Sequence, residues 1–207
     1  MGTFVERFLA MFLGRRERVL AIVAALLLLP TYLFPLWQLT MFAPQYPDGL
    51  RLQIYSYRLA GGNKGQDVDE INVLNHYIGM RSLAQEDFTE FKWMPFVIGI
   101  VALVFLRASV FGRAGALVDA TVLYGYFALF ALWSFAYKLY RYGHELAPGA
   151  AVNVPAFTPP IFGYKQLANF EVYSYPALGS YALAACGLVA AAAVVLSFLR
   201  ARREQAA

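Results

Sequence analysis

The chain has 207 residues, of which 60% are hydrophobic and only 14% are charged. Soluble domains carry about 25% charged residues, so this composition excludes an ordinary soluble protein and predicts an integral membrane protein in contact with membrane lipid. The net charge of +4 does not indicate a nucleic-acid partner, because no basic patch interleaved with stacking aromatic residues lies outside the predicted membrane flanks.

Four apolar segments are each long enough to cross a bilayer, which needs about 20 helical residues. They predict spans at residues 19–37, 94–111, 116–139 and 177–199. The first follows three arginines, as a secretory signal does, but bulky residues stand where a cleavage site needs small ones, so we expect an uncleaved anchor. The predicted fold class is an all-α membrane protein with four transmembrane helices and a small α+β extracytoplasmic cap.

The basic residues predict the orientation, because Lys and Arg beside short loops stay on the cytoplasmic side. Residues 1–18 and 200–207 are therefore predicted to be cytoplasmic, with both termini inside. Within residues 1–18, phenylalanines recur every four positions. This pattern predicts a short amphipathic helix in the membrane interface, or an extension of the first span broken at Gly14.

Residues 38–93 and 140–176 remain on the far side of the membrane, and loops this long are uncommon without structure of their own. Alternating hydrophobicity at residues 50–59 predicts a strand, with residues 169–175 as the best candidate for its partner. Asp67 and Glu70 are spaced as a capping box for the helix that follows. The 140–176 loop, rich in Pro, Gly and aromatic residues, is expected to be ordered and packed on this cap.

The stretch INVLNHYIGM places His76 and Met80 four residues apart. On a helix these two side chains share a face, and imidazole with thioether suits Cu(I). His144 or Met41, which lie on the same side of the membrane, could supply a third ligand. If Gly79 ends the helix, Met80 lies beyond it. The candidate residues that could orient the imidazole are Asn72 and Asn75.

Ordinary packing explains the same residues and is favoured, since methionine commonly fills gaps against aromatic rings. His144 lies among tyrosines, Lys138 and Arg141, which is typical of a membrane-interface belt. The alternative is that this segment supplies a second metal ligand or a contact for an anionic partner. Asp119 is the one acid inside a predicted span and a functional candidate, although its closeness to Arg113 explains it equally well.

Other chemistry lacks its parts in this sequence. No haem is expected, because neither histidine lies within a predicted span. Cys186 is the only cysteine and falls in the fourth span, so no intrachain disulfide can form. Motifs for nucleophilic or phosphate chemistry are absent, and the protein is not predicted to be an enzyme.

The stretches PLWQLTMFAPQYPDGLRL, INVLNHYIGM and GHELAPGAAVNVPAFTPPIFGYKQLANF resemble a family of uncharacterised bacterial inner-membrane proteins that accompany copper-supply proteins of nitrous oxide reductase maturation. The resemblance implies an accessory protein that handles or delivers copper on the periplasmic side to a metalloenzyme or its maturation partners. The alternative is a non-catalytic subunit of a membrane complex or transporter with a membrane or periplasmic protein partner. The small residues of ALAACGLVAAAAVV favour this alternative, because they let helices approach closely.

Overall fold

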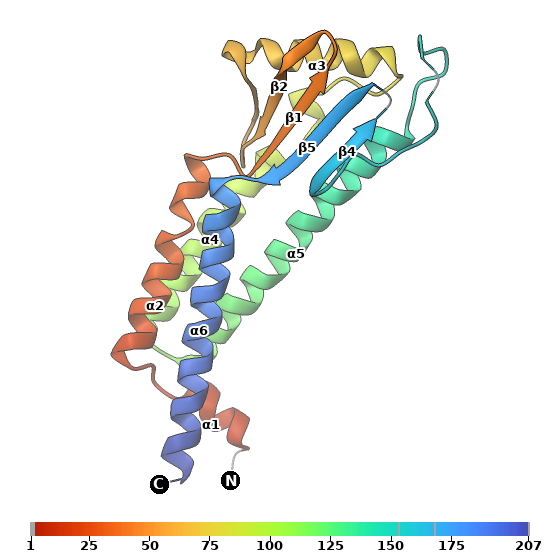
Figure 1. The fold of residues 1–207 in the computed structure, drawn as a ribbon. Helices are drawn as coiled ribbons and strands as arrows, with labels where there is room; N and C mark the ends of the chain where they lie inside the picture. The colour runs from red at the N-terminus through yellow and green to blue at the C-terminus, as the bar shows by residue number, and fades with distance from the viewer. Residues whose placement is uncertain (1–2, 153, 168, 207) are drawn as a thin grey trace.

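The computed structural model describes residues 3–152, 154–167 and 169–206. It has two layers, a bundle of helices and a five-stranded antiparallel sheet that lies across one end of the bundle (Figure 1). The short N-terminal helix and the end of the last helix lie at the opposite end of the molecule from the sheet (Figure 1).

Three helices of the described chain are long and apolar enough to cross a membrane. They are α4 (Glu90–Phe111), α5 (Ala114–His144) and α6 (Leu178–Ala206). The shortest has 22 residues, which corresponds to about 33 Å of helix and is enough for a hydrocarbon core of about 30 Å. The membrane character predicted from composition is therefore supported by three spans.

The prediction of four spans was wrong at the first apolar segment. Helix α2 (Arg15–Leu26) has 12 residues, or about 18 Å. It ends four residues before Pro30, whose ring would clash with the carbonyl at that distance. A 3₁₀ turn, η1 (Leu29–Tyr32), follows, and the chain is already a strand at Trp37. The small residues of α2 that are buried in the bundle, where this helix packs on α4 and α6, are Ala21, Ala24 and Ala25.

The predicted small cap is instead a sizeable sheet with strand order β3-β2-β1-β5-β4. Its central strand, β1, comes from residues predicted as the end of a span and the start of a loop. The predicted pairing of residues 50–59 with 169–175 was wrong, because β1 separates β2 from β5. The strands are β1 (Trp37–Ala43), β2 (Tyr46–Ile54), β3 (Leu59–Gly61), β4 (Gly163–Leu167) and β5 (Phe170–Pro176).

Helix α3 (Gln66–Tyr77) packs on one face of this sheet. The predicted capping box was wrong, because the residue before the helix is Gly65, which makes no side-chain cap. Asp67, only 2% exposed, instead accepts hydrogen bonds from the backbone N–H of Arg51 and the side chain of Asn63, both at 2.8 Å. The buried apolar residues of this layer are Leu39, Ala43, Leu50, Leu52, Ile71, Leu74, Ile78, Phe170 and Val172.

The helices enclose a second core. Helix α1 (Phe4–Ala10) is separate from α2 and packs on α6, where Phe4 and Phe8 each lie edge-on to Phe198 with ring centroids 5.5 Å apart. The least exposed residues of this core include Ile98, Val101, Phe105, Leu117, Ala120, Cys186, Ala190 and Ala193.

Sheet and bundle are joined where β5 runs into α6 and η1 runs into β1. The backbone N–H of Gly179 donates to the carbonyl of Pro35 at 2.9 Å, and a Cβ at this glycine would lie 2.8 Å from the same oxygen. Ser180 Oγ donates to the carbonyl of Leu36 at 2.6 Å. These contacts fix the first turn of α6 against the chain that leads into the sheet.

The segment after α5 packs against the end of α3 and against α5 itself. Ala147 N–H donates to the carbonyl of Gly79 at 2.7 Å. Gly143 lies in α5, and its carbonyl accepts a hydrogen bond from the backbone N–H of Phe157 at 3.0 Å. A Cβ at Gly143 would overlap the Phe157 carbonyl oxygen. The Glu145 carboxylate pairs with Arg141 at 2.6 Å.

Candidate functional site

A cavity of about 500 Å³ lies between the sheet layer and the helices. Strands β1, β2 and β5 and helix α3 line it on one side, and helices α4, α5 and α6 line it on the other. Figure 1 shows α5 leaning away from α4 and α6 toward the sheet end of the molecule. This divergence leaves room between the layers that backbone packing does not fill.

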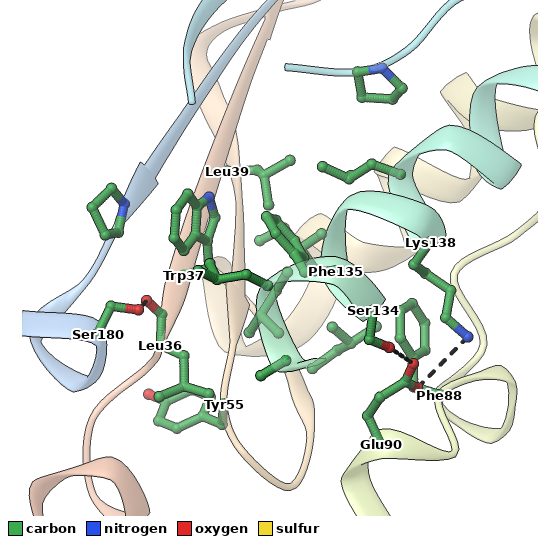
Figure 2. Close-up of a pocket in the computed structure, with 18 of the residues that line it drawn as sticks. Leu36, Trp37, Leu39, Tyr55, Phe88, Glu90, Ser134, Phe135, Lys138 and Ser180 are labelled. Carbon is green, nitrogen blue, oxygen red and sulfur yellow. Dashed lines mark hydrogen bonds and ion pairs between the residues drawn. The ribbon is translucent and has the colours of Figure 1, made fainter. Parts of the chain in front are cut away.

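The wall of the cavity is almost entirely apolar and rich in aromatic rings. Trp37 of β1 faces Phe135 of α5, with ring centroids 5.0 Å apart (Figure 2). Glu90 and Lys138 are the two charged side chains that line it. The larger apolar side chains of the wall include Leu39, Leu52, Phe88, Phe91, Phe127 and Phe170.

The two charges face each other across the α4–α5 contact (Figure 2). Lys138 Nζ lies 3.6 Å from Glu90 Oε2, and the side chains are only 21% and 17% exposed. Ser134 Oγ donates to Glu90 Oε1 at 2.6 Å, and Lys138 Nζ donates to the carbonyl of Asp87 at 2.7 Å. Glu90 Oε2 is buried and has no hydrogen bond within the described residues, so Lys138 is its main source of compensation.

Asn75 is an uncharged polar side chain set deeply in this wall. It is 3% exposed and lines the cavity. Helical spacing explains its position, because Ile71 and Ile78, four residues before and three after, point into the same layer.

The four predicted copper ligands divide into two pairs. Met41 and Met80 both line the cavity, and Met80 lies past the end of α3 because Gly79 adopts a φ of 78°. His76 and His144 are exposed and are not among the lining residues. The ring of His144 stacks on that of Tyr140, with centroids 3.8 Å apart. The thioethers therefore share a cavity that the imidazoles do not line, and copper binding stays a prediction.

The remaining candidates have other surroundings. Asn72, predicted to orient an imidazole, accepts the backbone N–H of Leu83 at 2.6 Å and so fixes the segment after α3. Asp119 is exposed in the second turn of α5. Among the described residues, no three His, Cys, Asp or Glu side chains lie close enough together to hold a metal ion.

Sequence reasoning missed the Glu90–Ser134–Lys138 cluster. Lys138 and Ser134 are four residues apart on α5, and Lys138 lies inside the predicted span 116–139. An ionisable residue in a span is a functional candidate, but the tyrosines around it led to the belt interpretation. Only the contact between α4 and α5 reveals Glu90 as its partner.

No protein-family model, curated protein or solved structure matches the chain. The resemblance to copper-supply accessory proteins therefore stays a prediction. The geometry of the cavity supplies the physical basis for a function.

Proposed function

We propose that this membrane protein binds the long apolar chain of a lipid-like molecule in the cavity between its sheet and its helices. The observation that carries the proposal is the cavity itself, about 500 Å³ in volume with an almost wholly apolar wall. Small-molecule sites in proteins have volumes of roughly 300–1,000 Å³ and mostly apolar linings with a few polar groups.

The shape of the site favours an elongated ligand. On α5 the lining runs from Tyr124 to Tyr142, a separation that corresponds to about 27 Å along a helix. Tyr124 lies in the first half of this 31-residue helix, within the candidate membrane span. A chain bound along this wall would extend from membrane depth toward the sheet.

The gain from such binding comes from removing apolar surface from water. Each buried methylene contributes about 0.8 kcal/mol relative to water, so about ten methylenes contribute about 8 kcal/mol, which lies within the range of roughly 4–15 kcal/mol that association costs. A chain that is already dissolved in lipid gains less. The polar groups of the wall are then expected to decide which lipid-like molecule is retained.

The proposal is tested by filling the cavity. The purified full chain in detergent micelles is titrated with a pyrene-labelled C16 hydrocarbon chain that has no polar head. Ala131→Trp places a large ring in the wall and should weaken binding at least tenfold. Leu129→Trp is the matched control, because Leu129 is 68% exposed on the same helix and does not line the cavity; its binding should stay within twofold of the native protein.

Absence of saturable binding by the native protein would overturn the proposal. So would equal binding by the Ala131→Trp variant, provided that its unfolding transition shows it to be folded. Copper delivery is not part of the proposal, because two of its four predicted donors, His76 and His144, are exposed rather than in the cavity wall.

A further inference from the structure

We infer that the lipid-like molecule held in this cavity has an uncharged head with a hydroxyl group, and that this hydroxyl donates a hydrogen bond to Glu90 Oε2. The inference rests on the proposed function, because it names the head that accompanies the apolar chain. Glu90 is the first residue of α4, and its carboxylate lies in the cavity wall where α4 meets α5 (Figure 2).

The Glu90 carboxylate is balanced in charge but incomplete in its hydrogen bonds. Oε1 accepts from Ser134 Oγ at 2.6 Å. Among the buried side-chain nitrogen and oxygen atoms of the described residues, Oε2 is the one without a hydrogen-bond partner. Lys138 Nζ lies 3.6 Å from it, which is an ion-pair contact but exceeds the roughly 2.7–3.2 Å of an N–H···O hydrogen bond.

A carboxylate oxygen buried without a donor is costly, and native proteins seldom leave one in that state. An ionised carboxylate only accepts hydrogen bonds, so the missing partner is an O–H or N–H group. Neither neighbour in the cluster supplies it, because Ser134 donates to Oε1 and Lys138 Nζ donates to the carbonyl of Asp87 at 2.7 Å. A donor on the bound molecule would complete the carboxylate from the cavity side.

The charge balance of the wall selects among the heads that carry a donor. Glu90 and Lys138 are the two charged side chains of the lining, and they neutralise each other. An ammonium or a phosphate head would add an uncompensated charge and lose its hydration in an apolar wall, which is strongly unfavourable. An ester or ether oxygen avoids this cost, but it only accepts and cannot donate to Oε2.

A hydroxyl meets both requirements at a single atom. It is uncharged, and its oxygen both donates and accepts hydrogen bonds. Because Glu90 Oε2 and Lys138 Nζ are 3.6 Å apart, one oxygen within hydrogen-bond distance of both is geometrically possible. The hydroxyl would then donate to the carboxylate and accept from the ammonium group.

The cluster also lies where a head leaves room for the apolar chain. Helix α4 ends beside Leu13, whose N–H donates to the carbonyl of Gly112, at the end of the bundle away from the sheet (Figure 1). Its first residue, Glu90, therefore lies toward the sheet. From Ser134 the lining of α5 continues to Tyr124, a separation of about 15 Å along a helix. The chain of the bound molecule would lie along this stretch.

The head is tested by competition against the headless pyrene-labelled C16 chain on the purified full chain in micelles. The competitors share a C16 chain and differ in the head: hexadecanol, monopalmitoylglycerol, methyl hexadecyl ether, hexadecylammonium, hexadecyl phosphate and hexadecane. At equal mole fraction in the micelle, hexadecanol or monopalmitoylglycerol should displace the probe at least tenfold more effectively than the ether, the charged molecules and hexadecane. The stronger of these two hydroxyl-bearing competitors shows whether the ligand is a simple alcohol or an acylglycerol.

The residue is tested with Glu90→Leu and Lys138→Met combined, so that neither charge stays alone in the wall; such a replacement of a buried ion pair is often neutral for stability. The hydroxyl-bearing competitor should lose its tenfold advantage over the ether, while hexadecane stays within twofold of its value on the native protein. The matched control, Glu86→Leu with Lys92→Met at exposed positions outside the lining, should keep the advantage. If the first double variant does not fold, Glu90→Gln carries the test and should reduce the advantage at least threefold.

Three outcomes overturn the inference while leaving the proposed function intact. They are an ether or charged competitor that matches both hydroxyl-bearing ones on the native protein, an unchanged hydroxyl advantage in a folded Glu90 variant, and equal weakening of hexadecane and the hydroxyl-bearing competitor in that variant. Failure of the headless chain to bind the native protein would instead remove the proposed function and this inference together.

Discussion

Replacing Lys138 by methionine should destabilise the protein by about 2–3 kcal/mol, because it leaves the buried Glu90 carboxylate without its cation. Lys138 Nζ lies 3.6 Å from Glu90 Oε2, and that oxygen has no hydrogen bond among the described residues. Methionine preserves much of the aliphatic stem of the lysine and removes only its ammonium group, which also lies 5.1 Å from the centroid of the Phe88 ring. The loss is therefore electrostatic rather than a loss of packing.

The magnitude follows from the separation and the exposure. Two unit charges 3.6 Å apart attract by about 4–5 kcal/mol at an effective dielectric constant of about 20. Breaking a fully buried pair by removing one partner costs about 3–5 kcal/mol. Because the side chains of Lys138 and Glu90 keep 21% and 17% exposure, solvent lowers the expected value below that range.

The assay is unfolding in mixed micelles followed by tryptophan fluorescence, with Lys138→Met, Glu90→Gln and the double variant compared in one cycle. The free energy of unfolding that the double variant loses should be about 1–2 kcal/mol smaller than the sum of the losses in the two single variants. Lys92→Met, at an exposed lysine of α4, should stay within about 0.5 kcal/mol of the native protein. A coupling below about 0.3 kcal/mol would refute the assignment of Lys138 as the compensating charge.

Further predictions concern the second long loop and the copper ligands. Gly143→Ala should lower the free energy of unfolding by about 2 kcal/mol or more, because its Cβ would overlap a backbone carbonyl; Gly125→Ala, with no atom within 4 Å, should be neutral or stabilising by up to about 1 kcal/mol, and equal losses would contradict this. A hydrogen bond from the Arg141 guanidinium lowers the pKa of Glu145 from its ordinary value of 4.5. The stabilisation that this carboxylate gives the folded protein is therefore complete above pH 4.5 and is lost as the pH falls through the lower pKa of the folded state. Unfolding midpoints at pH 6 and pH 3 should therefore differ less in Glu145→Gln than in the native protein. If the copper prediction holds, the protein binds about one Cu(I) and replacing His76 and Met80 together abolishes binding; unchanged binding removes them as ligands.

The membrane character of the chain could be predicted from the sequence because it depends on local composition. Predominantly apolar segments at 94–111, 116–139 and 177–199 correspond to α4, α5 and α6, since such a segment in lipid must satisfy its backbone hydrogen bonds within a helix. The alternation at 169–175 likewise indicates a strand, and β5 spans Phe170–Pro176.

The first apolar segment shows where local pattern is insufficient. Hydrophobicity at residues 19–37 is high on both sides of Pro30, yet only the first part is α-helical. From Trp37 onward the chain finds backbone partners on two sides, in β2 and in β5. Pairing of a strand with a segment about 130 residues away leaves no local signal that distinguishes the strand from the end of a span.

By itself, the sequence determined that this chain has apolar helices able to lie in a membrane, because hydrophobicity and helix length are properties of contiguous residues. Tertiary structure alone decided that α5 diverges from its neighbours beneath a sheet, that Glu90 meets Lys138, and that Asn75 is buried in a cavity wall. These features join residues from different elements. Their free energies depend on burial and on distances between side chains that no single stretch of sequence specifies.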